Sequence, residues 1–124
     1  MRPRIQLGRD VSARDYLLTL DECRERRRAY AAATADVDAL LTPTTQTPAI
    51  PIDRVDQTTT PAHFTRAVNY LGLCAIAVPS GYTAAGLPTS LQIVCAGGHE
   101  ATALRIAWAY ESATPWRERR PPLS

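Results

Sequence analysis

The 124-residue sequence predicts a fold of the α/β class. Two apolar runs, residues 74–79 (CAIAVP) and 91–96 (LQIVCA), have the character of strands, and a turn region rich in Gly and Pro separates them. Two longer segments, 12–34 and 99–113, have the pattern of helices. The chain is 45% hydrophobic and 21% charged, a composition typical of one ordinary globular domain rather than a disordered segment.

The first helix follows an N-terminal stretch, residues 1–11, that we expect to be irregular. Ser12 and Asp15 form a Ser-x-x-Asp capping box, which predicts a helix from there to about Thr34. An arginine-rich run, 24–28, lies within this helix, but neighbouring acidic residues balance it. We therefore interpret it as a solvated helix face rather than a nucleic-acid surface, and the formal net charge of +2 agrees with that interpretation. Apolar residues recur along the helix at Tyr16, Leu20, Cys23, Tyr30 and Ala31.

The middle of the chain alternates short elements with a long irregular stretch. Residues 38–42 (DALLT) are predicted to form a buried strand that Pro43 ends. Residues 44–61, which carry repeated Thr and three Pro, cannot form regular structure. Thr60 and Pro61 then predict the cap and first turn of a helix over 61–71, which Gly72 stops.

The C-terminal half is predicted to form a hairpin followed by a helix. The run 74–79 is almost wholly apolar, as in a strand covered on both faces. If the two apolar runs pair as an antiparallel hairpin, Cys74 faces Cys95. The helix over 99–113 is apolar nearly all round, so we expect it to be largely buried. In the tail, Trp116 is predicted to dock on the domain, and residues 117–124 to be mobile.

The number and spacing of the cysteines and histidines limit the metal sites and disulfides that the chain could form. The three cysteines are an odd number, widely spaced and without a C-x-x-C pair, so we expect free buried thiols in a reducing environment. Cys95, His99 and His63 form a weak zinc pattern, and buried apolar thiols explain the cysteines better. We predict no metal and no cofactor. No apolar run is long enough to span a bilayer or to form a signal peptide, so we expect a cytoplasmic protein.

A self-contained active site is not evident. The sequence has no Gly-x-Ser-x-Gly, no phosphate loop and no G-x-G-x-x-G. All 14 basic residues are Arg, so a Lys base, a Schiff base and a phosphate-binding Lys are excluded from these residues. His63 and His99 are better explained as surface or capping residues than as bases. Glu100 and Glu111 are about 16 Å apart on a helix, too far for an acid/base pair.

The order and spacing of several short motifs carry more information than any single residue. The chain resembles the C-terminal part of the amidase-signature family over nearly its whole length. The motifs are DALLTPT (38–44), FT (64–65), NYLG (69–72), AIAVPSG (75–81), GLPTSLQI (86–93), and Glu111 followed by TPW (114–116) and Pro121. The family often has Pro where Cys74 stands and Gly where Ser90 stands.

The resemblance implies a mixed sheet flanked by helices and hydrolysis of C–N amide bonds by a Ser–cis-Ser–Lys triad. In the family, the Lys and a Gly/Ser-rich segment lie N-terminal to the matched region. We therefore expect residues 1–124 to be a partial amidase domain that has no catalytic residues and is inactive alone. Its small amide substrate would bind only to the complete enzyme, and no nucleic acid or membrane would be a partner.

The resemblance also places the segment after LLTPT beside the acyl pocket, with Thr44, Phe64 and Asn69 as candidate pocket wall. Alternatively, Phe64 packs in the core and Asn69 caps the short helix. Members that use glutamine usually have an acidic residue where Ala62 stands, which favours a generic amidase.

Three interpretations of the whole chain remain open. It is an inactive remnant of an amidase gene, a subunit that completes a separately encoded N-terminal amidase half, or an interaction module that kept the fold. Self-association is a further expectation, because apolar surface is predicted where the N-terminal part would sit.

Overall fold

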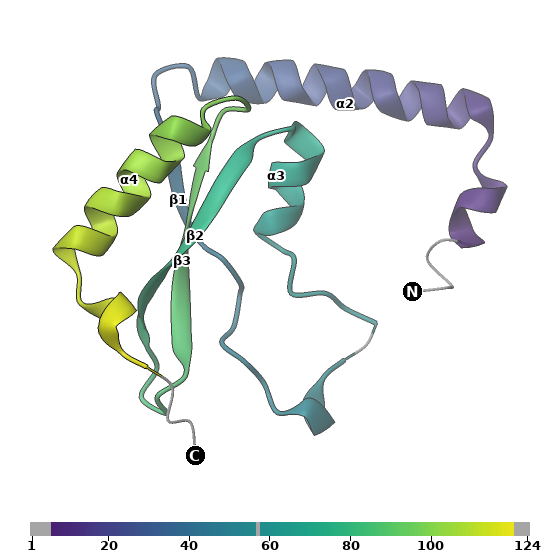
Figure 1. The fold of residues 1–124 in the computed structure, drawn as a ribbon. Coiled ribbons are helices and arrows are strands. Elements are labelled where there is room, and N and C mark those ends of the chain that lie inside the picture. Colours follow the sequence, from purple (N-terminus) through teal and green to yellow (C-terminus); the bar gives the residue numbers. More distant parts are fainter. Residues whose placement is uncertain (1–5, 57, 121–124) are drawn as a thin grey trace. The chain divides into compact units, whose positions relative to one another are not determined.

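The computed structural model describes residues 6–56 and 58–120, and the chain divides into two compact units between Thr34 and Ala35 (Figure 1). The first unit holds a short 3-10 helix and a long α-helix. The second unit holds a three-stranded sheet, two α-helices and two further 3-10 turns.

The N-terminal unit is built around helix α2, Ala13–Ala33, which follows the 3-10 helix η1, Leu7–Asp10. The predicted N-cap at Ser12 is confirmed. The Asp15 N–H donates to Ser12 Oγ at 3.1 Å, and Ser12 Oγ donates to Asp15 Oδ2 at 2.6 Å. The expectation that residues 1–11 are irregular is wrong for residues 7–10, which form η1, and residues 1–5 lie outside the described residues.

The surface of α2 is charged and no residue of this helix is buried. Arg26 donates to Glu22 at 2.6 and 2.9 Å, and Arg24 pairs with Asp21, as the i,i+4 and i,i+3 spacings predict. Both pairs are exposed, so each contributes at most about 0.5 kcal/mol. Of the apolar residues that recur along α2, Tyr16 is 58% exposed and Ala31 is also exposed, whereas Leu20, Cys23 and Tyr30 are half-buried.

The second unit is organised by a three-stranded antiparallel sheet of β1, Leu40–Pro43, β2, Cys74–Tyr82, and β3, Pro88–Cys95. The strand order is β1-β3-β2, so β3 is central (Figure 1). Cys74 lies opposite Cys95, which confirms the predicted hairpin register. The register shifts by one residue between Pro79 and Gly81, where the strand carries a bulge.

Two helices connect to this sheet. Helix α4, Glu100–Ala113, begins where the sequence predicts, after the turn at Gly97 and Gly98. Helix α3, Thr65–Leu71, ends at Gly72 in the left-handed conformation, with φ of 70° and a hydrogen bond of 2.9 Å from the Leu73 N–H to the Val68 carbonyl.

The predicted start of α3 at Pro61 is wrong by four residues. Thr60 Oγ1 accepts a long hydrogen bond from the Ala62 N–H at 3.4 Å, which closes a local turn two residues on instead of capping a helix. The N-cap position of α3 is Phe64. Between β1 and α3 the chain is otherwise irregular, as predicted, apart from the 3-10 turn η2, Ile52–Arg54.

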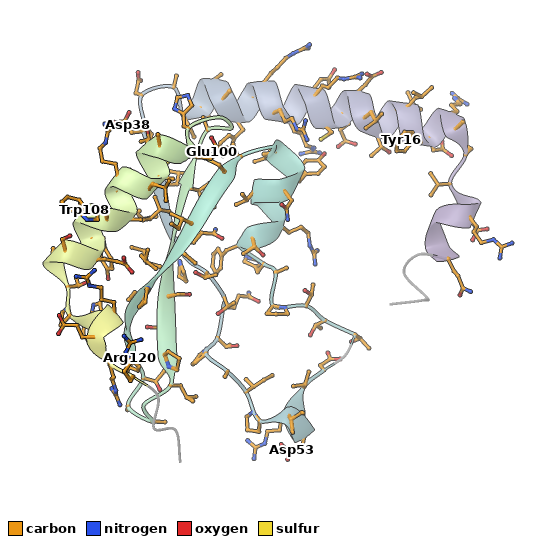
Figure 2. The ribbon with its side chains drawn as sticks, in the orientation of Figure 1. Tyr16, Asp38, Asp53, Glu100, Trp108 and Arg120 are labelled. Carbon is orange, nitrogen blue, oxygen red and sulfur yellow. The ribbon has the colours of Figure 1, made fainter. Side chains whose placement is uncertain are left out.

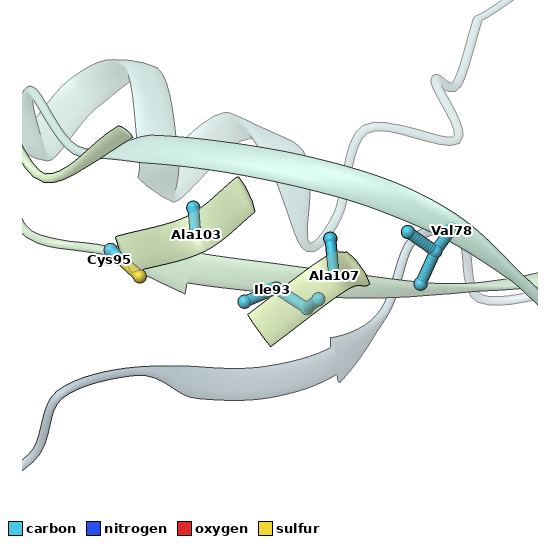
Figure 3. Close-up of a cluster of buried hydrophobic side chains, with 5 residues drawn as sticks. All are labelled: Val78, Ile93, Cys95, Ala103 and Ala107. Carbon is cyan, nitrogen blue, oxygen red and sulfur yellow. The ribbon is translucent and has the colours of Figure 1, made fainter. Parts of the chain in front are cut away.

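The core lies between α4 and one face of the sheet, as Figure 3 shows. Ile93 is fully buried, and Val78 and Cys95 flank it on the same face. Ala103 and Ala107, one helical turn apart on α4, cover these side chains. Their small size lets the helix approach the sheet closely, and burial of Ile93 alone stabilises the fold by about 2–3 kcal/mol.

Three predictions of burial are wrong. Leu41 on β1 is 58% exposed, because β1 is an outer strand with a neighbour on one side only. Ala75 and Ala77 of β2 are exposed on the face away from α4, so β2 is not covered on both faces. On α4, Leu104 and Trp108 are 57% and 71% exposed, and Trp108 points away from the sheet (Figure 2).

The C-terminal segment packs on the tip of the hairpin. Trp116, in the 3-10 turn η3, Trp116–Glu118, lies edge-on to Tyr82 with ring centroids 6.4 Å apart, so its predicted docking is confirmed. The Arg119 guanidinium also lies over the Tyr82 ring, 4.0 Å from its centroid. Residues 121–124 lie outside the described part, and the mobility of 117–124 stays a prediction.

The position of Ile93 predicts a large loss of stability on truncation. We expect Ile93→Ala to lower the free energy of unfolding by about 2–4 kcal/mol, because it removes apolar burial and leaves a cavity. The matched control is Ile52→Ala at a side chain that is 92% exposed, which we expect to change stability little. Urea unfolding followed by circular dichroism measures both, and equal losses would contradict the assignment of the core.

The exposed apolar surface of α4 predicts binding of a hydrophobic dye. We expect the purified chain to bind the dye or to self-associate, because Leu104 and Trp108 are neighbours at i,i+4 and both are exposed. The double variant Leu104→Gln, Trp108→Gln should lower dye fluorescence and association measured by light scattering. A wild-type chain that is a monodisperse monomer and does not bind the dye would contradict the prediction that α4 exposes an apolar surface.

Candidate functional site

A groove of about 480 Å³ opens in the second unit where β1 ends beside the tip of the β2–β3 hairpin. One wall is the end of β1 together with the segment that follows it. The other wall is the hairpin. Hydroxyl groups predominate among its polar groups. The lining residues are Leu41, Thr42, Pro43, Thr45, Gln46, Thr47, Pro48, Ala49, Ser80, Pro88, Thr89, Ser90 and Leu91.

A second hollow of about 680 Å³ lies on the other side of the same segment. Residues 45–49 line both hollows, so this stretch is the wall between them. Ile50, residues 54–56 and residues 59–61 complete the lining of the second hollow. Its walls come from irregular chain rather than from α-helices or strands.

Gln92 is the polar centre behind the groove. It is 4% exposed, the one buried polar side chain among the described residues. Its Nε2 donates to Thr42 Oγ1 at 3.2 Å and, more weakly, to the Phe64 carbonyl at 3.5 Å. The side chain thereby connects β3 to β1 and to the start of α3 on the face opposite α4. The sequence did not identify Gln92 as a site residue, although a lone polar residue within the apolar run LQIVCA was the available signal.

Thr44 lies between two residues that line the groove. Its N–H donates to the Ser90 carbonyl at 3.2 Å, which continues the β1–β3 pairing by one residue. Its Oγ1 is buried, and within the described part of the chain it has no hydrogen-bond partner. A buried hydroxyl in this state costs free energy until a partner reaches it.

The other two candidate wall residues, Phe64 and Asn69, lie at helix α3. Phe64 is half-buried at the start of α3, its ring edge-on to His63 at a centroid distance of 4.9 Å. Asn69 is exposed on α3, and its backbone carbonyl accepts from the Gly72 N–H at 3.3 Å. Neither is among the described residues that line the groove. None of the three candidate wall residues is thus among the described residues that line the groove: Thr44 lies between two that do, and Phe64 and Asn69 lie at α3.

Two of the five serines line the groove, Ser80 and Ser90. Ser80 Oγ lies 3.3 Å from Thr89 Oγ1, so its hydroxyl is paired with another hydroxyl rather than with a base. His63 and His99 are both exposed, and His99 is the N-cap residue of α4. In the described part of the chain, no hydrogen bond joins either histidine to a serine.

Two groups have shifted pKa values. Hydrogen bonds from the Thr58 side chain and N–H lower the pKa of Asp56, so their stabilisation is present at neutral pH and is lost as the pH falls through that lowered pKa. Burial raises the pKa of the Cys95 thiol, and the Cys74 and Asp38 charges add to that effect. Across residues 6–56 and 58–120, no cluster of three or more His, Cys, Asp or Glu side chains could hold a metal ion.

The match to a family model covers most of the chain. Residues 1–104 match the model of the family named Amidase. The chain therefore belongs to the amidase-signature family, as the order of its motifs indicated.

Known relatives agree with this assignment. The chain is 42% identical over 90 residues to a glutamyl-tRNA(Gln) amidotransferase subunit of Geobacter metallireducens, a match that covers 68% of the chain and 18% of that protein. It is 38% identical over 125 residues to the fatty acid amide hydrolase of Arabidopsis thaliana, covering 92% and 20%. The solved 6-aminohexanoate cyclic dimer hydrolase in complex with substrate is 30% identical with a TM-score of 0.77, covering 95% of this chain and 28% of that one. The chain thus spans about a fifth of the length of these curated relatives.

Within the described residues, no helix combines the length and the apolar character that crossing a bilayer requires.

The hydrogen bonds of Gln92 predict a specific loss of stability. We expect Gln92→Leu to lower the free energy of unfolding by about 1–3 kcal/mol, because it leaves a buried hydroxyl and a carbonyl without their donor. Gln46→Leu, at an exposed glutamine in the groove wall, is the matched control and should change little. Thermal unfolding measures both, and a Gln92→Leu variant as stable as the wild type would show that these bonds do not hold β1 and α3 to β3.

Proposed function

We propose that this chain supplies the C-terminal part of the catalytic domain of an amidase that hydrolyses linear amides, and that it does not hydrolyse amides by itself. In this proposal a nucleophilic serine, a relay serine and a Lys base come from a segment other than residues 1–124. The observation that carries the proposal is an amidase-family match over residues 1–104 in a chain without Lys.

The chemistry of the groove supports the second part of the proposal. Acyl transfer by a serine needs a base within hydrogen-bond reach of its hydroxyl. Ser80 pairs with Thr89, and the exposed His63 and His99 form no hydrogen bond with a serine in the described residues. A serine without a base has an ordinary alcohol pKa and is a poor nucleophile at neutral pH.

The unpaired strand edges and the exposed face of the sheet support the proposal that this chain is one part of a larger catalytic domain. In the described chain β1 and β2 pair with β3 only, so each leaves an outer row of backbone N–H and C=O groups available for a further strand. Ala75 and Ala77 on β2 are exposed. In a strand that is buried on both faces, such apolar residues would be covered by a further part of the protein. A segment that adds strands and covers this face would also be the source of the catalytic residues.

The groove beside Ser80 and Ser90 is our candidate for the wall of the acyl pocket. Thr44 contributes the buried hydroxyl without a partner, which a substrate or the completing segment would satisfy. Phe64 and Asn69 remain proposed wall residues on the side of α3. Ala62 stands where glutamine-using members carry an acid, so we favour a small linear amide over glutamine.

A completing partner follows from the same proposal. Several of the curated relatives are named as subunits of glutamyl-tRNA(Gln) amidotransferase, and a subunit by definition works together with other chains. We favour an N-terminal amidase segment as the part that completes this chain, in preference to a free-standing module.

The assay of the pure chain tests this proposal. We expect no turnover of a panel of aliphatic and aryl amides and no labelling by a serine-directed covalent probe, because no base activates a serine. The catalytic residues are expected on the added segment, so turnover should arise only after mixing with an N-terminal amidase segment that carries the Lys and the Gly/Ser-rich stretch.

Variants distinguish real activity from contamination. Ser80→Ala and Ser90→Ala remove the two serine hydroxyls of the groove, and Ser112→Ala on the exposed side of α4 is the matched control. Turnover by the pure chain that Ser80→Ala or Ser90→Ala abolishes and Ser112→Ala retains would overturn the claim that the chain is inactive alone.

A further inference from the structure

Two cysteines face each other at one end of the β2–β3 hairpin, away from the groove. Cys74 is the first residue of β2 and Cys95 the last of β3, and they are direct partners in the sheet. Both are free thiols. Neither has a role in the proposed function, and neither lines the groove among the described residues.

The geometry of the sheet brings the two residues within the reach of a disulfide. Directly opposed residues of an antiparallel pair have Cα atoms about 4.5–5.5 Å apart, and a disulfide spans Cα separations of about 4.4–6.8 Å. Paired residues also point to the same face. The Cys74 Sγ lies 3.2 Å from the Ala96 carbonyl oxygen and 3.8 Å from the Cys95 carbonyl oxygen, so it is directed toward the end of β3.

The two thiols differ in exposure, which gives them different roles. Cys74 is half-buried, so a small reagent reaches it, whereas Cys95 is 3% exposed within the core. Burial and the neighbouring Cys74 raise the pKa of Cys95, so this thiol stays protonated at neutral pH. Cys74 is therefore the thiol that an oxidant meets first, and Cys95 the one placed to resolve the product.

We propose that Cys74 and Cys95 form an oxidisable dithiol that closes to an intramolecular disulfide when a hydroperoxide reaches Cys74. In the first step the Cys74 thiolate attacks the peroxide, whose O–O bond breaks, giving a sulfenic acid and releasing an alkoxide or hydroxide. In the second step the Cys95 sulfur attacks the Cys74 sulfur, forming the S–S bond and releasing water. The hydroperoxide is the oxidant, and the two thiols together lose two electrons and two protons.

The disulfide would fix a junction between two helices. The turn after α3 and the turn before α4 already touch here, since a Cβ built on Gly97 would lie 2.4 Å from the Gly72 carbonyl oxygen. Cys74 and Cys95 are each two residues from those glycines. A bond between them would tie the end of α3 to the start of α4 and restrict the unfolded chain over residues 74–95.

The test is oxidation of the full chain with hydrogen peroxide, followed by alkylation of free thiols and peptide mapping. We expect a Cys74–Cys95 link with loss of two hydrogen atoms in native buffer, and a mixture of pairings in concentrated urea. The variant Cys23→Ser is the matched control and should give the same link. Cys74→Ser should abolish it, as should Cys95→Ala. The oxidised wild type should unfold roughly 10 °C higher than the reduced form, with no such shift in Cys74→Ser.

Every other outcome counts against the proposal. A native product with the same mixture of pairings as in urea would show that the fold does not select this pair. Accumulation of a sulfinic acid on Cys74 without a disulfide would show that Cys95 is not placed to resolve it. A link between two chains, or one that includes Cys23, would assign the reactive thiol elsewhere.

Discussion

The contact of α4 with the central strand is the interaction on which the rest of the second unit depends. Ala103 and Ala107 lie over Ile93, and this small core is the main apolar burial that the described residues contain. Because β3 pairs with both β1 and β2, a single buried side chain on β3 anchors all three strands. On the opposite face, hydrogen bonds from Gln92 connect β3 to Thr42 of β1 and to the Phe64 carbonyl at the start of α3.

In this arrangement β3 has a paired strand on each side, whereas β1 and β2 each have a paired strand on one side only within the described residues. Residues 92–95 are buried on both faces, whereas Ala75 and Ala77 on β2 and Leu41 on β1 are exposed. Apolar strands with open outer edges are characteristic of a sheet that continues. The groove lies at one end of this sheet and holds hydroxyls without a base, which is how the wall of an active site would look without its catalytic residues. The chain length, about a fifth of its curated relatives, agrees with that view.

Local signals in the sequence predicted the elements well. The Ser12 capping box, the Gly72 stop and the Cys74–Cys95 register depend on nearby residues or on period-2 pairing, and all three were correct. Burial was predicted less well. The apolar composition of α4 indicates which side chains could be buried, but it does not indicate whether another element packs against them. Trp108 is exposed for that reason. The start of α3 was missed because Thr60 and Pro61 suit a helix cap and a turn equally well.

The site was only partly predictable. Thr44 belongs to a recognisable motif and lies between two residues that line the groove, but Gln92 required knowledge of what faces β3 across the sheet. The hydrogen bonds from Gln92 to Thr42 and to Phe64 join residues 50 and 28 positions apart, and no local pattern encodes such contacts. The serines and histidines could be counted from the sequence, whereas their separation in space could not.

The most direct measurement of the central claim is the activity of a chimera. The segment of 6-aminohexanoate cyclic dimer hydrolase that matches this chain, 28% of that protein, would be replaced by residues 1–124. If this chain is the C-terminal part of an amidase domain, the chimera should hydrolyse the 6-aminohexanoate cyclic dimer well above the rate of the same enzyme with the segment deleted. A chimera that folds cooperatively, as judged by calorimetry, but is no faster than the deleted enzyme would contradict the account.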